Sequence, residues 1–567
     1  MTYKNEISVI ETLELLNGKF ADVFGHFAQD EYAFWLGSAI SKERVIGLDG
    51  VLSQLLEFLR NNLTDGDDCV FRIAFEEVLS IANLTNDERS EIDLSEPANS
   101  WPCIGEIINK LWNSYSDVLS VRVSGKPLDY LLWEGLDFKS TFSSQTPDLE
   151  HLAIGMLVLE GAVSEVATAN WDGLLEAAMT ELGHEGTGYQ VTITGQDLQG
   201  PKACATLYKF HGCALRAIGD ELEYRKLLVV RDDQILGWLG NDAFKMVREQ
   251  LHALVQRRRT LMIGLSAQDP NIKTLFGGVG EGKIWQWNNS PTPIVISSLK
   301  IGKDHQTLLK LTYGSEAFET HQDQILDSAA FPAHSKPLLT ALLLDVLTKK
   351  LIVLAGDASA PALSKLGHEK ISKGLEHLRN LAALAGDKDR FKLVEMIAWT
   401  TARARHQLQD GNSPQGSLKY YPLDSAPIHL MKDKQALAVT GLREAAVALG
   451  LVGKLDEKGD WRTTIDDPTD AQSGAFRLTT DYATSRIFLA ANDDVITDLL
   501  SCGAFNEEDS DAVIVCSKRV SPRQQRNPRA NLPGRRGGPR YVAFGTILKE
   551  ADDLDQLSET FRQEVAI

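Results

Sequence analysis

The feature that most constrains the fold of this chain is a repeated order of short apolar run, polar turn and amphipathic helix. Four such runs precede turns rich in glycine, asparagine or histidine, at residues 32–36, 163–167, 205–210 and 260–265. Alternating strands and helices predict an α/β fold with a doubly wound, mostly parallel sheet. The carboxyl ends of parallel strands meet at one edge of the sheet, and ligands bind there. We therefore expect the four turns to form one binding site.

Length and period favour two domains. At 567 residues the chain is too long for a single core. Residues 338–410 are mostly helical by period, and residues 435–505 mix helix and strand signals. We therefore predict a first α/β domain at 1–300 and a C-terminal α+β domain at 301–567 that regulates it or binds a partner. Residues 7–27 have the apolar spacing of one amphipathic helix.

Charge is distributed unevenly along the chain. The formal net charge of −20 argues against wholesale wrapping by a nucleic acid, because most of the surface would repel phosphates. Residues 518–540 are the exception, with eight Lys or Arg, no acid, four Pro and three Gly. That composition predicts a mobile basic loop. The loop could meet a nucleotide, a nucleic acid or an acidic partner protein, or it could be a solvated segment that offsets the negative surface.

Cysteine spacing and hydropathy bear on metals, membranes and location. The six cysteines are isolated from one another, at positions 69, 103, 204, 213, 502 and 516. Without a CxxC pair the sequence encodes neither a zinc ribbon nor a redox motif, so we expect no metal. No signal peptide pattern opens the chain, and no run of about 18 apolar residues predicts a membrane span. These observations favour a cytoplasmic protein without membrane contact.

Each strand-end turn also has an ordinary structural explanation. The glycine turn at Gly37 lets backbone N–H groups approach a diphosphate, but it can equally be a packing turn. Asn170 and Asp172 are residue types that cap helices. A single histidine after a strand, such as His211, is more often structural than catalytic, and Asp269 before a proline is typical of a helix start. No acid stands at the spacing of the dehydrogenase fingerprint, which disfavours hydride transfer.

Together the turns form a more specific pattern. The segments are Leu36-Gly-Ser-Ala-Ile-Ser41, Thr168-Ala-Asn-Trp-Asp-Gly173, Leu207-Tyr-Lys-Phe-His-Gly212 and Gly264-Leu-Ser-Ala-Gln-Asp-Pro-Asn-Ile272. In this order the first half of the chain resembles the sirtuin family, in particular its bacterial sirtuin-like NADase branch. The resemblance implies a Rossmann-like sheet with a helical small lobe, for which residues 94–145 and 213–240 supply the length. Two positions depart from the family: its Gly-Ala-Gly is Gly37-Ser38-Ala39 here, and Ala169 replaces a threonine.

The resemblance implies a role for each matching residue. Asn170 would lie beside the nicotinamide-bearing ribose, and His211 would be the general base. Residues assigned to NAD binding are Gly37, Ser38, Ala39 and Ser41 near the diphosphate and ribose, Asp172 beside Asn170, and Gly264, Ser266 and Asp269 toward the adenosine. These residue types suit the chemistry, since an amide orients a water without adding a buried charge and an imidazole accepts a proton near neutrality.

The chemistry implied is cleavage of NAD as a substrate. With water as nucleophile the chain would be an NAD glycohydrolase that releases nicotinamide and ADP-ribose. One alternative is an NAD-dependent protein deacylase, although the four-cysteine zinc module of classical sirtuins is absent from this sequence. The other is a non-catalytic sensor of NAD or ADP-ribose, against which the presence of both Asn170 and His211 argues.

The resemblance also implies a biological setting. Bacterial sirtuin-like NADases pair the catalytic domain with a domain or protein that responds to infection, and the activated enzyme starves the infected cell. We therefore expect an NAD-depleting effector of abortive antiviral defence. A sensor or activator protein encoded nearby, or a nucleotide or nucleic-acid trigger, would switch it on. By analogy we expect a homo-oligomer.

Overall fold

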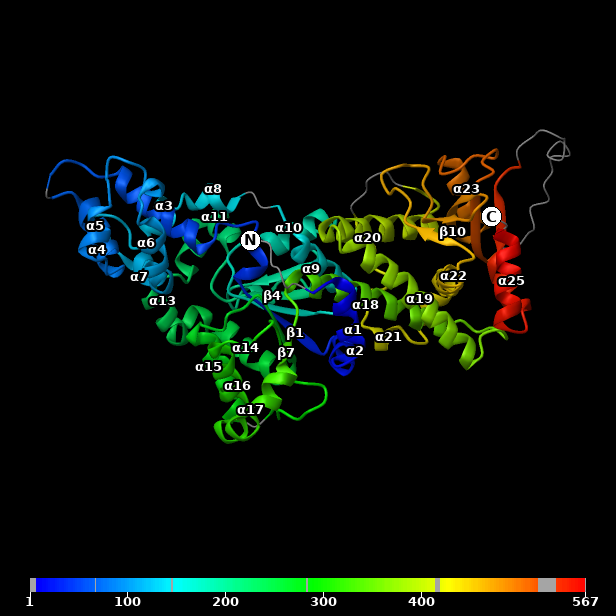
Figure 1. Cartoon of the computed structure of the whole chain (residues 1–567), viewed down its shortest axis with the longest axis horizontal. Coiled ribbons are helices and arrows are strands. Elements are labelled where there is room, and N and C mark those ends of the chain that lie inside the picture. Colours follow the sequence, from blue (N-terminus) through cyan, green and yellow to red (C-terminus); the bar gives the residue numbers. More distant parts are fainter. Residues whose placement is uncertain are drawn as a thin grey trace.

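The computed structural model describes most of the chain and contains two sheets. The described residues are 7–66, 68–143, 146–281, 284–413, 419–518 and 537–565. Within them a seven-stranded sheet occupies the middle of the molecule, and a five-stranded sheet lies toward the C-terminal end (Figure 1). Long helices run between the two sheets (Figure 1).

The larger sheet is parallel throughout, with the strand order β3-β4-β2-β1-β5-β6-β7. Its strands are β1 Tyr32–Leu36, β2 Glu165–Thr168, β3 Tyr189–Thr192, β4 Ala205–Lys209, β5 Arg259–Ile263, β6 Ile294–Ser297 and β7 Ala330–Phe331. All five residues of β1 are buried, as expected for a strand covered on both faces. From β1 the chain adds β2, β4 and β3 on one side and β5 to β7 on the other. The predicted doubly wound, Rossmann-like, sirtuin-like fold is confirmed.

Helices cover both faces of this sheet. On one face lie α1 Val9–Asn17, α2 Ala21–Phe27, α9 Leu149–Leu159 and α10 Leu174–Glu181. On the other lie α14 Lys245–Arg257, α15 Pro270–Glu281, α16 Lys303–Tyr313 and α17 Ser315–Ala329. The single helix predicted over 7–27 is wrong. Gly18 ends α1 by donating its N–H to the Glu14 carbonyl, and the chain turns before α2.

A helical small lobe with its own core is inserted after β1. Its helices are α3 Leu48–Asn61, α4 Val70–Ile81, α5 Asn86–Ser90, α6 Ile104–Leu111, α7 Tyr115–Ser120 and α8 Phe138–Ser143. Residues from α11 Ala214–Gly219 complete this core, and α12 Glu221–Tyr224 and α13 Asp232–Gly237 follow in the chain. The small lobe expected from the sequence is therefore present, and it begins earlier than residue 94.

The C-terminal sheet is mixed, with the order β12-β11-β10-β9-β8. Its strands are β8 Arg462–Thr464, β9 Phe476–Thr479, β10 Thr484–Asn492, β11 Ala512–Lys518 and β12 Arg540–Ala543. The last three are parallel, and β8 and β9 are antiparallel additions. The accompanying helices are α18 Ser335–Gly356, α19 Lys365–Gly386, α20 Arg390–Arg405, α21 Ile428–Met431, α22 Leu442–Glu457, α23 Asp493–Ser501, α24 Phe544–Glu550 and α25 Leu554–Val565.

The first sheet continues beyond residue 300. Strand β7 belongs to it, and α18 contributes residues to both the core of the first sheet and that of the second. The division of the chain at residue 300 stays a prediction. The basic loop expected at 518–540 falls mainly on residues 519–536, which lie outside the described residues.

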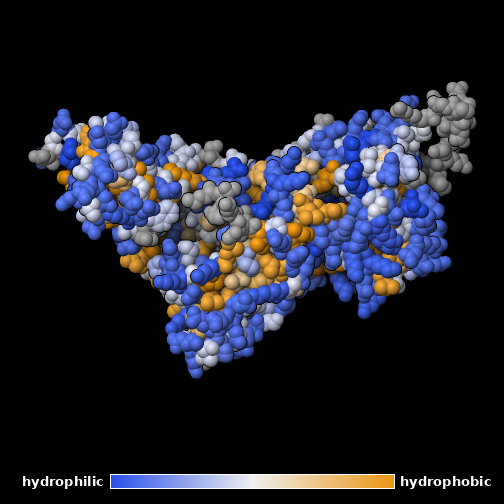
Figure 2. Space-filling model, in the orientation of Figure 1, coloured by the Kyte–Doolittle hydropathy of each residue, from blue (hydrophilic) through white to orange (hydrophobic). Residues whose placement is uncertain are grey.

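Two surface properties complete the description. On the face shown in Figure 2, hydrophobic residues gather over the middle of the molecule, and hydrophilic residues cover both ends. None of the helices in the described ranges is both long and apolar enough to cross a bilayer.

Candidate functional site

The turns after β1 and β5 interlock where the strand order of the first sheet reverses. The Gly37 N–H donates to the Ile263 carbonyl (3.1 Å), and the Ala39 N–H donates to the Gly264 carbonyl (3.2 Å). A β-carbon on Gly37 would lie 2.3 Å from the Gly264 carbonyl oxygen, and Gly264 has a φ of +65°. Glycine is therefore required at both positions. Doubly wound sheets bind their ligands at this reversal point.

Asn170 follows β2 and is fixed onto the β1 turn. Its backbone N–H donates to Thr168 Oγ1 (3.0 Å), and the Thr168 hydroxyl donates to the Leu36 carbonyl (3.1 Å). The Asn170 amide nitrogen donates to the Gly37 carbonyl (3.2 Å) and lies 3.5 Å from Ser41 Oγ. The side chain is thus oriented by neighbouring strand ends, and it does not cap a helix in these contacts.

Ser41 is buried and paired with a histidine that the sequence did not reveal as a site residue. His151 Nε2 lies 3.3 Å from Ser41 Oγ, and the Asp148 backbone N–H donates to His151 Nδ1 (3.1 Å). Since Nδ1 accepts, Nε2 carries the hydrogen and donates to Ser41. Burial lowers the pKa of His151 to about 4, so the ring is neutral near pH 7. The Ser41 oxygen therefore accepts from His151 and faces the Asn170 amide, and its hydroxyl hydrogen can be donated to another acceptor.

His211 follows β4 and faces an acidic side chain. His211 Nε2 and Asp269 Oδ2 are 3.1 Å apart, at an angle that makes no regular hydrogen bond. The other Asp269 oxygen accepts the Asn271 N–H (2.8 Å) at the start of α15, as the sequence predicted for a helix start. The backbone of His211 is held by the Val229 N–H, which donates to its carbonyl (3.0 Å), and Gly212 has a φ of +95°.

Asn170 and His211 are brought together by the register of the sheet. Strands β2 and β4 pair in parallel with Thr168 opposite Lys209. Each presumed catalytic residue stands two positions beyond that pair. Burial and, to a smaller extent, the charge of Asp269 raise the pKa of Tyr115 on α7 in the small lobe, which indicates that this lobe also reaches the edge. The edge therefore carries an Asn–Ser–His group beside a His–Asp pair.

The remaining predicted residues have simpler surroundings. Asp172 is buried, and its carboxylate accepts the Leu174 N–H (3.2 Å) at the start of α10, which is the structural role weighed from sequence. Lys209 lies beneath it, donating to the Asp172 carbonyl and to Glu176 at 2.5 Å each. The side chains of Ser38, Ala39 and Ser266 are exposed at the turns after β1 and β5.

The cysteines add no cluster to this site. All six are free, and Cys213 is buried beside Lys209 at 3.5 Å. Within the described ranges, no three His, Cys, Asp or Glu side chains are grouped as metal ligands would be. The absence of zinc from the working protein stays a prediction.

Comparison with known proteins agrees with this geometry. Residues 164–283 match the family model of the SIR2-like domain, from β2 to the end of α15, and so include Asn170, His211 and Asp269. No curated protein matches the chain. The match supports a sirtuin-like family for this domain, and SIR2-like domains bind NAD. The match and the fold together indicate an NAD-utilising domain.

Proposed function

We propose that the chain is an NAD glycohydrolase that transfers the ADP-ribosyl group of NAD to water. The observation that carries the proposal is the pairing of two groups at adjacent strand ends. One is Asn170 with Ser41, and the other is His211 with Asp269. Both groups occur at the edge formed by the interlocked glycine turns, where doubly wound sheets bind their ligands. A protein that only binds NAD would have little use for the pair of His211 and Asp269.

The reaction needs a site that tolerates developing positive charge on the ribose. When the bond between nicotinamide and ribose breaks, its electron pair leaves with nicotinamide and the sugar becomes oxocarbenium-like. Asn170 orients the ribose or the attacking water through a neutral amide, and Ser41 donates its free hydrogen to a ligand oxygen. Water adds to the ribose carbon and loses a proton to His211, and Asp269 stabilises the resulting imidazolium.

Two other functions fit parts of the same site. A protein deacylase would use the same residues with an acyl-lysine peptide as the second substrate. A sensor of NAD or ADP-ribose would use the turns alone. We prefer hydrolysis because His211 can act as a general base, and because the sequence lacks the zinc module with which classical sirtuins build their peptide groove.

We further propose that this activity is an NAD-depleting response in bacterial antiviral defence. An unregulated NADase would empty its own cell, so the region beyond the first sheet would restrain the enzyme or receive a trigger. The trigger would be a partner protein, a nucleotide or a nucleic acid. Because α18 contributes residues to both cores, a conformational change caused by the trigger in one region can be transmitted through this helix to the other.

Incubation of the purified full chain with NAD alone tests the activity. Hydrolysis predicts equimolar nicotinamide and ADP-ribose, and both should disappear in Asn170→Ala. The exposed C-terminal His429 gives a matched control, since His429→Ala should retain the wild-type rate. Nicotinamide released only with an acetyl-lysine peptide would identify a deacylase. NAD bound without any cleavage, also when a candidate trigger is present, would identify a sensor.

A further inference from the structure

A cavity separate from the turns of the NAD site lies between the two halves of the chain. Its volume is about 350 Å³, and its lining is Leu149, Lys336, Asp387, Lys388, Arg390 and Phe391. These residues come from the start of α9, the start of α18 and the turn from α19 into α20. Volumes of this order are typical of sites for small molecules.

Three of the six lining residues are cationic. Lys336 Nζ donates to Glu43 (2.7 Å) and lies 3.4 Å from Asp148 Oδ2. Arg390 donates to the Ile7 carbonyl (3.3 Å). Lys388 is exposed, and among the residues that the structure describes it has no partner for its ammonium group. A fourth cation stands close by, because the Arg44 guanidinium lies 5.6 Å from the ring centre of the lining residue Phe391. This gathering contrasts with the net charge of −20.

The backbone reinforces these charges. Leu149 opens α9, Lys336 is the second residue of α18, and Arg390 and Phe391 open α20. All three helices have eleven or more residues. The amino terminus of a helix carries a partial positive charge and presents N–H donors, which favours bound anions. Aspartates already accept one N–H at the ends of α9 (Asp148) and α20 (Asp389), whereas no side-chain hydrogen bond caps the end of α18.

The carboxylates around the cavity are engaged by the protein itself. The lining residue Asp387 accepts the Val9 N–H (2.7 Å). Asp148 accepts the Leu149 N–H (2.8 Å) and pairs with Arg44 (3.2 Å). Glu150 accepts the Ser335 hydroxyl (2.9 Å), and burial raises the pKa of its carboxyl to about 7. These carboxylates pair with Arg44 (Asp148, 3.2 Å) and with Arg390 (Asp387, 3.9 Å), and Glu43 pairs with Lys336 (2.7 Å). Among the described residues, Lys388 is the lining cation that they leave without an ion pair.

We propose that this cavity is a binding site for the phosphate group of a small phosphorylated ligand, distinct from the NAD site. Lys388 and Arg390 contact the phosphate from the α19–α20 turn, and Lys336 contacts it from α18. The site joins elements of both halves of the chain. The site also adjoins the hydrogen bonds that link Asp148 through His151 to Ser41. A ligand in the cavity can therefore shift the position of Ser41 in the turn after β1.

Calorimetric titration of the full chain with inorganic pyrophosphate, at constant ionic strength, tests the site without using NAD cleavage. We expect saturable binding of one equivalent that Lys388→Glu weakens by at least about tenfold, since a contact charge is reversed. Lys373→Glu on the exposed side of α19 is the matched control, and it should keep the wild-type affinity. Thermal unfolding of both variants verifies that they remain folded.

Each other outcome overturns the proposal. Equal binding by the wild type, Lys388→Glu and Lys373→Glu would mean that pyrophosphate sits elsewhere, the NAD site included. Equal weakening by both variants would indicate a general effect of charge. No binding by the wild type would show that the cavity does not hold phosphate groups. None of these results depends on whether the chain cleaves NAD, so a failure here is distinguishable from a failure of the proposed function.

Discussion

The two sheets of this molecule use polar residues in opposite ways. At the carboxyl edge of the first sheet, side chains from different strands face one another, as Asn170 faces Ser41 and His211 faces Asp269. In the second sheet, the polar residues at the ends of β10 and β11 bind backbone groups. Asn492 at the end of β10 accepts two N–H groups of α23, and the Ser517 hydroxyl at the end of β11 donates to the Gly441 carbonyl.

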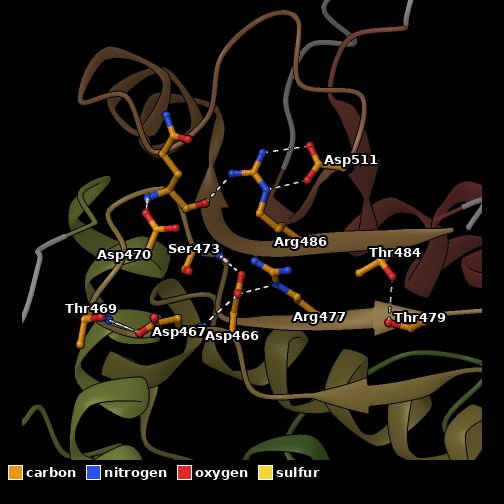
Figure 3. A network of polar contacts seen from close by, with 12 residues as sticks. Asp466, Asp467, Thr469, Asp470, Ser473, Arg477, Thr479, Thr484, Arg486 and Asp511 are labelled. Carbon is orange, nitrogen blue, oxygen red and sulfur yellow. Dashed lines mark hydrogen bonds and ion pairs between the residues drawn. The ribbon is translucent and has the colours of Figure 1, made fainter.

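In the network beside β9 and β10, side chains also pair with one another (Figure 3). The Arg486 guanidinium makes two bonds to Asp511, at 2.8 and 2.9 Å, and a further bond to the Gln472 carbonyl (2.5 Å). Asp466 accepts the Gly474 N–H (2.8 Å) and the Arg477 side chain (2.5 Å). Charged residues here fasten a loop to a strand. The comparison teaches that polar density alone does not mark a reactive site, whereas polar side chains that converge from separate strand ends can.

The largest stability effect is expected where the two regions are joined. Lys350 on α18 and Glu160 after α9 are both fully buried, with Lys350 Nζ 2.8 Å from Glu160 Oε2. Lys350→Met leaves the Glu160 carboxylate buried without its cation, which should cost about 3–5 kcal/mol. Urea unfolding measures this loss. The exposed pair Lys310–Glu319 provides the control, since Lys310→Met should cost less than about 1 kcal/mol. A similarly small loss for Lys350→Met would mean that the buried Lys350–Glu160 pair does not stabilise the contact between the two regions.

The second-largest stability effect is expected beside the C-terminal sheet. Buried Arg403 donates to the carbonyls of Pro468 (2.5 Å) and Asp470 (2.5 Å) and so holds the loop before β9. Arg403→Met should cost about 2–4 kcal/mol because the Pro468 and Asp470 carbonyls lose their donor, while NAD cleavage should stay unchanged. Unfolding by urea and nicotinamide release measure the two quantities. Loss of cleavage in a folded Arg403→Met protein would mean that the second sheet takes part in the chemistry.

A pH-dependent effect is expected beside the first sheet. Burial raises the pKa of Glu150 from 4.5 to about 7, so the folded state binds a proton that the unfolded state releases. Stability from this group is therefore present below about pH 4.5 and is lost as the pH rises through 7. Glu150→Gln should be more stable than the wild type by about 1–3 kcal/mol at pH 8, and the gain should vanish near pH 4. Exposed Glu369→Gln should show no such trend. A gain that is independent of pH would refute this assignment.

The smallest effect concerns Asn492, which like Asn170 stands at the carboxyl end of a strand. Asn492→Ala removes the N-cap of α23 and should cost about 1 kcal/mol. NAD cleavage should continue at the wild-type rate, because this asparagine serves only its helix. A stability loss too small to measure would show that the cap is replaced by water, and the two asparagines would then differ less than we argue.

Much of the fold could be predicted because it depends on local pattern. The sequence shows each apolar strand followed by its turn, which is rich in glycine, asparagine or histidine. The parallel sheet then brings these turns to one edge. The break at Gly18 was missed, since the apolar spacing continues across it and only the glycine end of α1 interrupts the helix.

The site was predicted less completely because its supporting contacts join distant residues. His151 stands inside an apolar helix, and only the Asp-x-x-His pattern at the start of α9 could have pointed to it. Nothing in the sequence links Asp269 to His211, because the pair forms only when β4 and β5 take their positions in the sheet. The pair of Lys350 and Glu160 could not be predicted either, because these two residues are 190 positions apart in the chain.

The central claim is that the strand-end groups of the first sheet cleave NAD, and the rate of nicotinamide release by His211→Ala tests it most directly. The account predicts that the wild-type chain, with its trigger present, releases nicotinamide from NAD without an acyl-lysine peptide. His211→Ala should be slower by about 10²–10⁴-fold, while Asn492→Ala keeps the wild-type rate. If folded His211→Ala released nicotinamide as fast as the wild type, the general base would lie elsewhere and the account would be contradicted.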